Sequence, residues 1–256
     1  MKTITVFLSD DHAIFREGLR LLLKAAGDID VVGEARNGHE AVSKTKRLQP
    51  NVVLMDVAMP SLNGLEATRR ISIEVPGTKV LILSTYSDDQ RVQQAMEAGA
   101  VGYLMKETAS NDLLQAIREA CKGNGFFSPP IAKRLVKRLR NRDPRSNNTD
   151  VLALTSRQTE VVQLIAEGYS SKEMAGLLVV SVKTVEKHRQ AVMDRLDIHE
   201  IAGLTRYAVS AGLVACCRVA NAPSMAEQMA RVSATNGDEE YGLTTGIKSR
   251  TYERSL

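Results

Sequence analysis

One ten-residue stretch decides the fold of this chain: NVVLMDVAMP, residues 51–60. Four apolar residues in a row, 52–55, include two valines, which is typical of a strand buried on both faces of a parallel sheet. Pro60 stops any continuation, so Asp56 ends the strand. Ligands bind at this edge of open α/β sheets. Its position alone leaves open a structural role, in which Asp56 only caps a turn or helix.

The composition is that of an ordinary soluble globular protein. The 256 residues suffice for one large domain or two small ones, and 43% are hydrophobic and 25% charged. No run approaches the apolar length that spans a bilayer, and the amino-terminal stretch is too soon acidic for a secretory signal. The three Cys and four His show no disulfide or metal-ligand spacing. We therefore expect a cytoplasmic protein with no membrane partner.

Strand-like and helix-like runs alternate through the first half of the chain. The strand-like runs are residues 3–8, 29–35, 51–56, 79–83 and 102–105, and the helical runs are 13–26, 38–48, 64–74, 90–98 and 110–122. Five such pairs predict an α/β domain over residues 1–122, built on a doubly wound, five-stranded parallel sheet. Right-handed crossovers then place the carboxyl ends of all five strands at one edge.

Five polar residues follow or end those strands and should converge at that edge: Asp10, Asp11, Asp56, Ser84 and Lys106. Three carboxylates repel one another unless a divalent cation joins them, and hard oxygen ligands suit Mg²⁺. A carboxylate can also accept a phosphoryl group and form an aspartyl phosphate. The amine would neutralise the transferred group, and the hydroxyl could hydrogen-bond one of its oxygens.

Residues 1–122 resemble the receiver domain of two-component response regulators. The matching pieces are the acidic pair at 10–11, the D-x-x-M-P-x-x-x-G motif at 56–64, Ser84, and the run G-A-x-G-Y-L-x-K at 99–106. The resemblance implies a flavodoxin-like fold in which a sensor histidine kinase phosphorylates Asp56. It also implies a Mg²⁺ ion held by Asp10, Asp11, Asp56 and the backbone carbonyl of Ala58.

The same resemblance assigns three residues around the transferred group. Lys106 would stabilise it, while Ser84 and Tyr103 match the family's switch pair. In that pair the hydroxyl moves toward the phosphoryl group and the aromatic ring turns inward. Without the family, Tyr103 reads as a half-buried strand aromatic.

A basic segment separates the two halves of the chain. Residues 123–150 hold 7 basic and 2 acidic residues, whereas the chain as a whole has a net charge of only +4. Residues 131–140 form a basic amphipathic stretch, and the residues after it have linker composition. We expect a linker, in which a helix continues into a solvated tether. Extra attraction to DNA phosphates is the alternative.

The second half, residues 151–214, has an all-helical pattern. Thr155 and Gln158 fit a capping box that opens a helix ending at Glu167. Three more helices are predicted over residues 171–178, 182–196 and 200–212. Two helices joined by a tight turn form the helix-turn-helix plan, in which the second helix enters the major groove of DNA.

Helical phase divides the third of these helices into two faces. Val182, Val185, Val192, Met193 and Leu196 form the predicted buried stripe. The opposite face carries basic and amide side chains suited to phosphates and base edges: Lys183, Thr184, Lys187, Gln190, Ala191 and Asp194. A merely solvated helix face is the alternative on the pattern alone.

This half resembles the DNA-binding domain of LuxR-type regulators, through the strings L-T-x-R at 154–157, K-E-M-A at 172–175 and S-x-x-T-V-x-x-H at 181–188. With the receiver, it makes the chain similar to the NarL/FixJ class of response regulators. The resemblance places Lys187, Gln190 and Glu186 at base edges. It places four further residues on the DNA backbone: Lys183, Thr184, His188 and Arg189.

The carboxyl-terminal residues 215–256 depart from that family, whose members usually stop soon after the match to Gly212. Few large apolar residues occur after residue 220, so we expect mostly disorder there. An interaction tail is the alternative.

These patterns together predict a transcriptional regulator that is not an enzyme. Phosphorylation of Asp56 would activate it, and the phosphorylated chain would bind promoter DNA as a homodimer. One alternative is a phosphotransferase or phosphatase of doubly wound fold, although no Gly-rich phosphate loop is present. Another is a regulator that acts without phosphorylation.

Overall fold

The computed structural model describes residues 3–108, 110–140 and 154–214, with side chains described up to residue 134 in the segment that ends at 140. The expected disordered tail, residues 215–256, lies outside the described residues. So do residues 141–150 of the expected linker.

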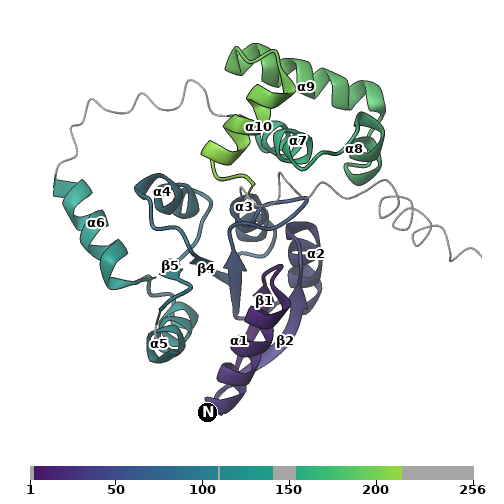
Figure 1. The fold of residues 1–256 in the computed structure, drawn as a ribbon. Coiled ribbons are helices and arrows are strands. Elements are labelled where there is room, and N and C mark those ends of the chain that lie inside the picture. The colour runs from purple at the N-terminus through teal and green to yellow at the C-terminus, as the bar shows by residue number, and fades with distance from the viewer. Residues whose placement is uncertain (1–2, 109, 141–153, 215–256) are drawn as a thin grey trace, which may run out of the picture. The chain divides into compact units, whose positions relative to one another are not determined.

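The first half is a parallel sheet with strand order β2-β1-β3-β4-β5-β6 (Figure 1). The strands are β1 (Ile4–Ser9), β2 (Ile29–Ala35), β3 (Val52–Asp56), β4 (Lys79–Ser84), β5 (Gly102–Met105) and β6 (Phe126–Phe127). The order and the parallel pairing confirm the doubly wound fold. The predicted number of five strands was wrong, because β6 adds a sixth that pairs parallel to β5. Two residues are too few to show a strand periodicity.

Helices cover both faces of the sheet. α1 (Ala13–Ala25) and α5 (Ser110–Cys121) pack on one face, where their leucines join those of β1, β3 and β4. α2 (Gly38–Leu48), α3 (Gly64–Glu74) and α4 (Asp89–Glu97) pack on the other. β3 lies between these layers and is buried at all five positions, as its apolar run predicted.

Side-chain caps fix where the helices on the second face begin. The side chains of Asn37, Asn63 and Asp88 each accept a hydrogen bond from the backbone N–H three residues on. Asn63 matters most here, because it starts α3 directly after the loop that follows Asp56.

The segment that leaves α5 still belongs to the packed structure at its start. After β6, the helix α6 (Pro129–Arg140) begins, and Ile131 is buried in the same cluster as residues of β3 and α4. Arg134 donates to the carbonyl and the hydroxyl oxygen of Ser87. The stretch expected to be a linker therefore supplies a strand and a helix.

The second half consists of α7 (Ser156–Ala166), α8 (Ser171–Leu177), α9 (Val182–Leu196) and α10 (Ile201–Ser210). The capping box predicted at Thr155 and Gln158 is present, and Ser170 with Glu173 forms a second one. A separate apolar core, which includes Val161, Val185 and Leu204, joins the helices. α8 and α9 form the predicted helix-turn-helix.

Two details of this half were not anticipated. Val182 was predicted to be buried but is 39% exposed, because it occupies the first turn of α9, beyond the reach of the core. Val179, in the turn between α8 and α9, has a φ of 53°. That left-handed conformation is unfavourable for a β-branched residue.

In the part of the chain that the structure describes, no helix combines the length and the apolar character needed to cross a membrane.

Candidate functional site

The topology brings the predicted acidic residues and the lysine to one edge. Asp10 directly follows β1, Asp56 ends β3, Ser84 ends β4 and Lys106 directly follows β5. β1 and β3 are neighbours although they are not consecutive in the chain, so the strand order reverses beside them. Such a switch point is where doubly wound sheets bind ligands.

The carboxylates form a compact group. One ligand atom from each of Asp10, Asp11, His12 and Asp56 lies within 4.8 Å of the others. The ammonium of Lys106 lies 2.7 Å from Oδ2 of Asp10 and 3.1 Å from Oδ2 of Asp56. Asp10 and Asp56 thus share a single lysine, while Oδ1 of Asp11 lies 2.9 Å from Nδ1 of His12.

This group fits a hard divalent cation. Burial raises the pKa of the Asp56 carboxyl; Lys106 opposes the rise and the charge of Asp10 adds to it. Apart from their ion pairs with Lys106, the Oδ2 atoms of Asp10 and Asp56 accept no hydrogen bond from the described residues. A cation bound to carboxylate oxygens would relieve both the crowding and the missing bonds.

Residues of α1 hold Asp10 and Lys106 in place. Arg16 donates to the backbone carbonyl of Asp10 at 2.7 Å and to Glu34 at 2.9 Å. The Lys106 ammonium also lies 4.8 Å from the ring centre of Phe15, a cation–π distance. The lysine is thereby aimed at the carboxylates.

The two residues of the predicted switch pair, Ser84 and Tyr103, both bond to the backbone of Tyr86. The N–H of Tyr86 donates to the Ser84 hydroxyl at 3.0 Å, and the Tyr103 hydroxyl donates to the carbonyl of Tyr86 at 2.7 Å. The Tyr103 ring is fully buried, and burial raises the pKa of its hydroxyl to about 12. Tyr103 is thus an inward-facing core aromatic.

The loop after Asp56 is tightly folded. The carbonyl of Val57 accepts from the N–H of Gly64 at 2.9 Å and of Met59 at 3.2 Å. The N–H of Ala58 donates to the Asp56 carboxylate. The Ala58 residue expected to offer a carbonyl ligand therefore already contacts the Asp56 carboxylate through its N–H.

The predicted DNA-contacting residues lie along α9. Four of them are exposed: Lys183, Glu186, Lys187 and Gln190. The other three are partly buried: Thr184, His188 and Arg189. Two already have partners, because Thr184 lies 2.9 Å from the Ser181 hydroxyl and Gln190 donates to Asp194 at 2.8 Å. The face therefore offers cationic and amide groups in one row.

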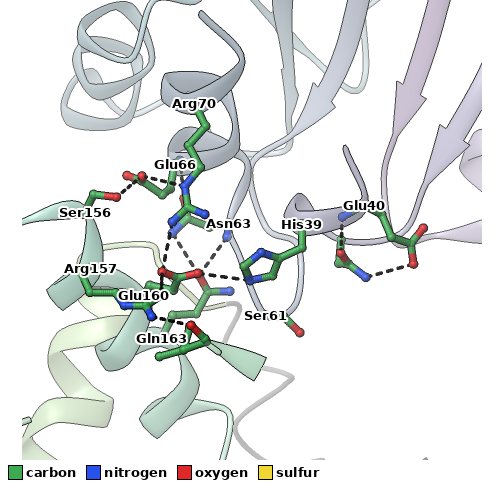
Figure 2. Close-up of polar contacts among 12 residues, drawn as sticks. His39, Glu40, Ser61, Asn63, Glu66, Arg70, Ser156, Arg157, Glu160 and Gln163 are labelled. Atoms are coloured by element: carbon green, nitrogen blue, oxygen red, sulfur yellow. Dashed lines mark hydrogen bonds and ion pairs between the residues drawn. The ribbon is translucent and has the colours of Figure 1, made fainter. Parts of the chain in front are cut away.

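Sequence reasoning missed a second polar cluster, drawn in Figure 2, which joins α7 to the receiver half. Glu160 is fully buried, and its carboxylate meets His39, Arg70 and Arg157 at 3.2, 3.1 and 2.9 Å. Burial alone would raise the pKa of Glu160, but these partners hold it at about 2. The Ser156 hydroxyl also donates to Glu66 of α3.

The same face of α7 also contacts the loop after Asp56. Gln163 bonds to the backbone of Met59 and Asn63, and Glu167 accepts from the backbone N–H of Ser61. A signal for the cluster exists in the sequence: Glu160, Gln163 and Glu167 recur at spacings of three and four, and every residue between them is apolar. That spacing marks one helical face. It does not say what the face contacts.

Comparison with known proteins gives two family matches. The family described as "Response regulator receiver domain" matches residues 6–118, and "Bacterial regulatory proteins, luxR family" matches residues 152–208. The response regulator protein VraR of Staphylococcus aureus is 34% identical over 212 residues, which cover 83% of this chain and 99% of VraR.

Two solved structures extend the comparison. A LuxR-family two-component response regulator from Aurantimonas sp. SI85-9A1 is 34% identical, with a TM-score of 0.52, over 54% of this chain and 99% of that chain. The RcsB response regulator of Salmonella typhimurium is 24% identical, with a TM-score of 0.56, over 82% and 99%. RcsB is similar in fold only.

The chain belongs to the response regulators of two-component systems. Its second half places it in the NarL/FixJ class, whose output domain is a LuxR-type helix-turn-helix. It is therefore a DNA-binding transcription regulator of a kind that is generally not enzymatic.

Proposed function

We propose that a sensor histidine kinase phosphorylates Asp56 and thereby activates the chain to bind promoter DNA as a homodimer. The observation that supports this most is the convergence of Asp10, Asp56 and Lys106 within ion-pair distance at the switch point of the sheet. A regulator of promoters acts where the DNA is, so the proposal places it in the cytoplasm.

Each residue has a defined part in the transfer. A carboxylate oxygen of Asp56 forms a bond to phosphorus while the N–P bond of the kinase's phosphohistidine breaks, and the leaving imidazole takes up a proton. Lys106 neutralises the group that arrives. Asp10, Asp11, Asp56 and the carbonyl of Ala58 would hold Mg²⁺, which supplies charge neutralisation of the phosphoryl oxygens when bound.

The response then spreads through a shift between two states. The Ser84 hydroxyl moves to donate a hydrogen bond to a phosphoryl oxygen. It thereby loses the hydrogen bond that it accepts from the Tyr86 N–H at 3.0 Å. Tyr103 is bonded to the same residue, so the rearrangement reaches both members of the pair.

On the DNA side, we propose that Lys187, Gln190 and Glu186 read base edges. Four other residues of α9 would contact the DNA backbone: Lys183, Thr184, His188 and Arg189. The exposure of Lys183, Lys187 and Gln190 supports this assignment.

The experiment is phosphorylation by acetyl phosphate, followed by intact mass, with and without Mg²⁺. We expect one added phosphoryl group in the parent chain, dependent on Mg²⁺, and none in Asp56→Ala. Uptake by Asp56→Ala at the rate of the parent chain would place the acceptor elsewhere.

A further inference from the structure

The outer side of α9 carries two acidic residues, Glu186 and Asp194, among its basic and amide side chains, and both are exposed. Glu186 follows Lys183 by three residues and precedes Gln190 by four, a spacing that puts all three side chains on one side of the helix. Phosphates repel a carboxylate on a helix that enters the major groove. A partner that the DNA bases supply would offset this repulsion.

The two acidic residues differ in the bonds that they already make. Asp194 accepts a hydrogen bond from Nε2 of Gln190 at 2.8 Å, so its carboxylate is engaged within the helix. Glu186 makes no hydrogen bond or ion pair with any residue that the structure describes, although Lys183 and Arg189 each lie three residues away on the same helix. Both of its carboxylate oxygens are therefore available to accept hydrogen bonds from a ligand.

The place of Glu186 in the fold favours contact with a base. The amino-terminal residues of a recognition helix contact base edges, and Glu186 lies near the start of α9, which begins at Val182 after the cap at Ser181. The preceding residue, Val185, is fully buried in the core of the helical half. The backbone that carries Glu186 is thereby held in place, as the geometry of base contacts requires.

The major groove offers few partners to a carboxylate. A carboxylate only accepts hydrogen bonds, and the donors on the base edges there are the N4 amino group of cytosine and the N6 amino group of adenine. The adenine amino group lies between two acceptors, its own N7 and O4 of the paired thymine. The cytosine amino group has an acceptor, guanine O6, on one side only. Cytosine therefore suits a carboxylate best.

Lys187 favours the same base pair. It is exposed, and it too makes no hydrogen bond or ion pair with the described residues. Helical geometry puts Glu186 and Lys187 on either side of the line from Lys183 to Gln190, so an acceptor and a donor stand next to each other. A C·G pair presents the matching groups, because the N4 donor of cytosine lies beside the O6 and N7 acceptors of guanine.

Resting on the proposed reading of DNA by α9, we propose that Glu186 selects cytosine at one position of the half-site, the stretch of DNA that one chain reads. Its carboxylate accepts a hydrogen bond from the N4 amino group. Guanine and thymine present acceptors to it at that position, and adenine adds a second acceptor beside its amino group. The carboxylate thus weakens binding to wrong sites more than binding to the right one.

The test uses the full-length chain, phosphorylated with acetyl phosphate, as the parent, Glu186→Gln, Glu186→Ala and Glu200→Gln. The last variant is the matched control, because Glu200 is an exposed glutamate outside α9 whose side chain makes no cap bond at the start of α10. It removes one negative charge from the same half of the chain. Each form selects sites from a random-sequence duplex pool, and fluorescence anisotropy then measures its affinity for every single-base variant of the parent's site.

We expect one position of the half-site at which the parent prefers C·G and loses affinity roughly 5- to 150-fold with other base pairs. Glu186→Gln should shift the preference at that position toward adenine, because an amide pairs with adenine N6 and N7. Glu186→Ala should discriminate there at least about fivefold less than the parent. Glu200→Gln should keep the preference of the parent at every position.

A base analogue tests the contact atom itself. Pyrimidin-2-one, put in place of the selected cytosine, lacks the N4 amino group. The analogue should weaken binding by the parent at least about fivefold more than binding by Glu186→Ala, because only the parent bonds to that group. Comparing the four affinities as a cycle removes any effect of the analogue on the duplex alone.

Three outcomes would overturn the inference. The first is tighter binding of both Glu186 variants to every duplex with an unchanged order of preference, which would mean that the carboxylate only repels phosphates. The second is an A·T pair, in the parent's site, at the position that changes. The third is equal weakening of the parent and Glu186→Ala by the analogue. Failure of the proposed function looks different, because the parent chain itself would then select no sequence from the pool.

Discussion

Replacing Gly64 by Ala should destabilise the receiver half and slow phosphorylation of Asp56. A Cβ built on Gly64 lies 1.8 Å from the carbonyl oxygen of Asp56 and 3.1 Å from Cγ of Met55. Carbon–oxygen contacts need about 3.3 Å, so the backbone would have to move by roughly 1.5 Å. The same movement breaks the bond from the Gly64 N–H to the carbonyl of Val57, now 2.9 Å long.

The cost follows from those two changes. Forced overpacking costs about 1–3 kcal/mol, and a buried backbone group left unpaired costs about 1–3 kcal/mol. Because alanine lowers the conformational entropy of the unfolded chain, it offsets this loss of stability by up to about 1 kcal/mol. At the middle of those ranges the expected net loss is about 3 kcal/mol, which lowers the melting temperature of a domain of this size by about 9–15 °C.

The natural control is Gly18→Ala. Gly18 lies exposed on α1, and a Cβ there meets nothing within 4 Å. Alanine in that helix should stabilise by about 0.5–1 kcal/mol. Because the chain has no Trp, unfolding is best followed by differential scanning calorimetry. Acetyl phosphate uptake measured by intact mass supplies the functional readout, and we expect it to slow at least tenfold in Gly64→Ala alone.

A melting temperature of Gly64→Ala within about 2 °C of the parent would refute the steric argument. So would equal stability of the two alanine variants. Normal stability with slow uptake would mean that the clash is absorbed by a shift of the Asp56 carbonyl without global cost.

Three further predictions concern the DNA-binding half. Val179→Asn should raise its stability by about 1 kcal/mol in calorimetry, because Val179 is 89% exposed and its φ of 53° suits Asn better. The pKa of Glu160 is about 2 in the folded chain, against an ordinary 4.5. Its ionised carboxylate therefore adds to the free energy of unfolding above pH 4.5, and this contribution is lost as the pH falls toward 2. Glu160→Gln should therefore flatten the dependence of unfolding free energy on pH in that window, and an unchanged slope would contradict the ion-pair account. Lys187→Ala should relax base preference at one position at a cost of about 1–3 kcal/mol, whereas Lys183→Ala should weaken all duplexes alike and reduce the salt slope by about one unit. Binding series over single-base variants at several salt concentrations would separate the two, and the reverse pattern would overturn the assignment of faces.

Much of the fold could be predicted because local signals and packing agree. Helices α2, α3 and α9 begin and end where the pattern placed them, since side-chain caps at Asn37, Asn63 and Ser181 mark their starts. β6 escaped prediction because two residues carry no period and its only reason to be a strand is the edge of β5. The edge of β5 exists only once the sheet has assembled, so the local sequence of residues 126–127 cannot predict the pairing.

The candidate site divides in the same way. Convergence of Asp10, Asp56 and Lys106 could be predicted, because parallel topology alone brings strand ends together. The contacts of Gln163 and Glu167 could not, because helical phase identifies a polar face without naming the surface that meets it.

The structured start of the connector limits how far the two halves of the chain can separate. β6 and α6 fix the chain as far as Arg140, and the helical half begins at Leu154. The intervening backbone spans at most about 50 Å even when fully extended. A covalent connection of this length keeps the local concentration of one half around the other in the millimolar range. A contact between the halves with a dissociation constant in the millimolar range would therefore be formed about half the time, and a change of about 1.4 kcal/mol would shift that balance tenfold.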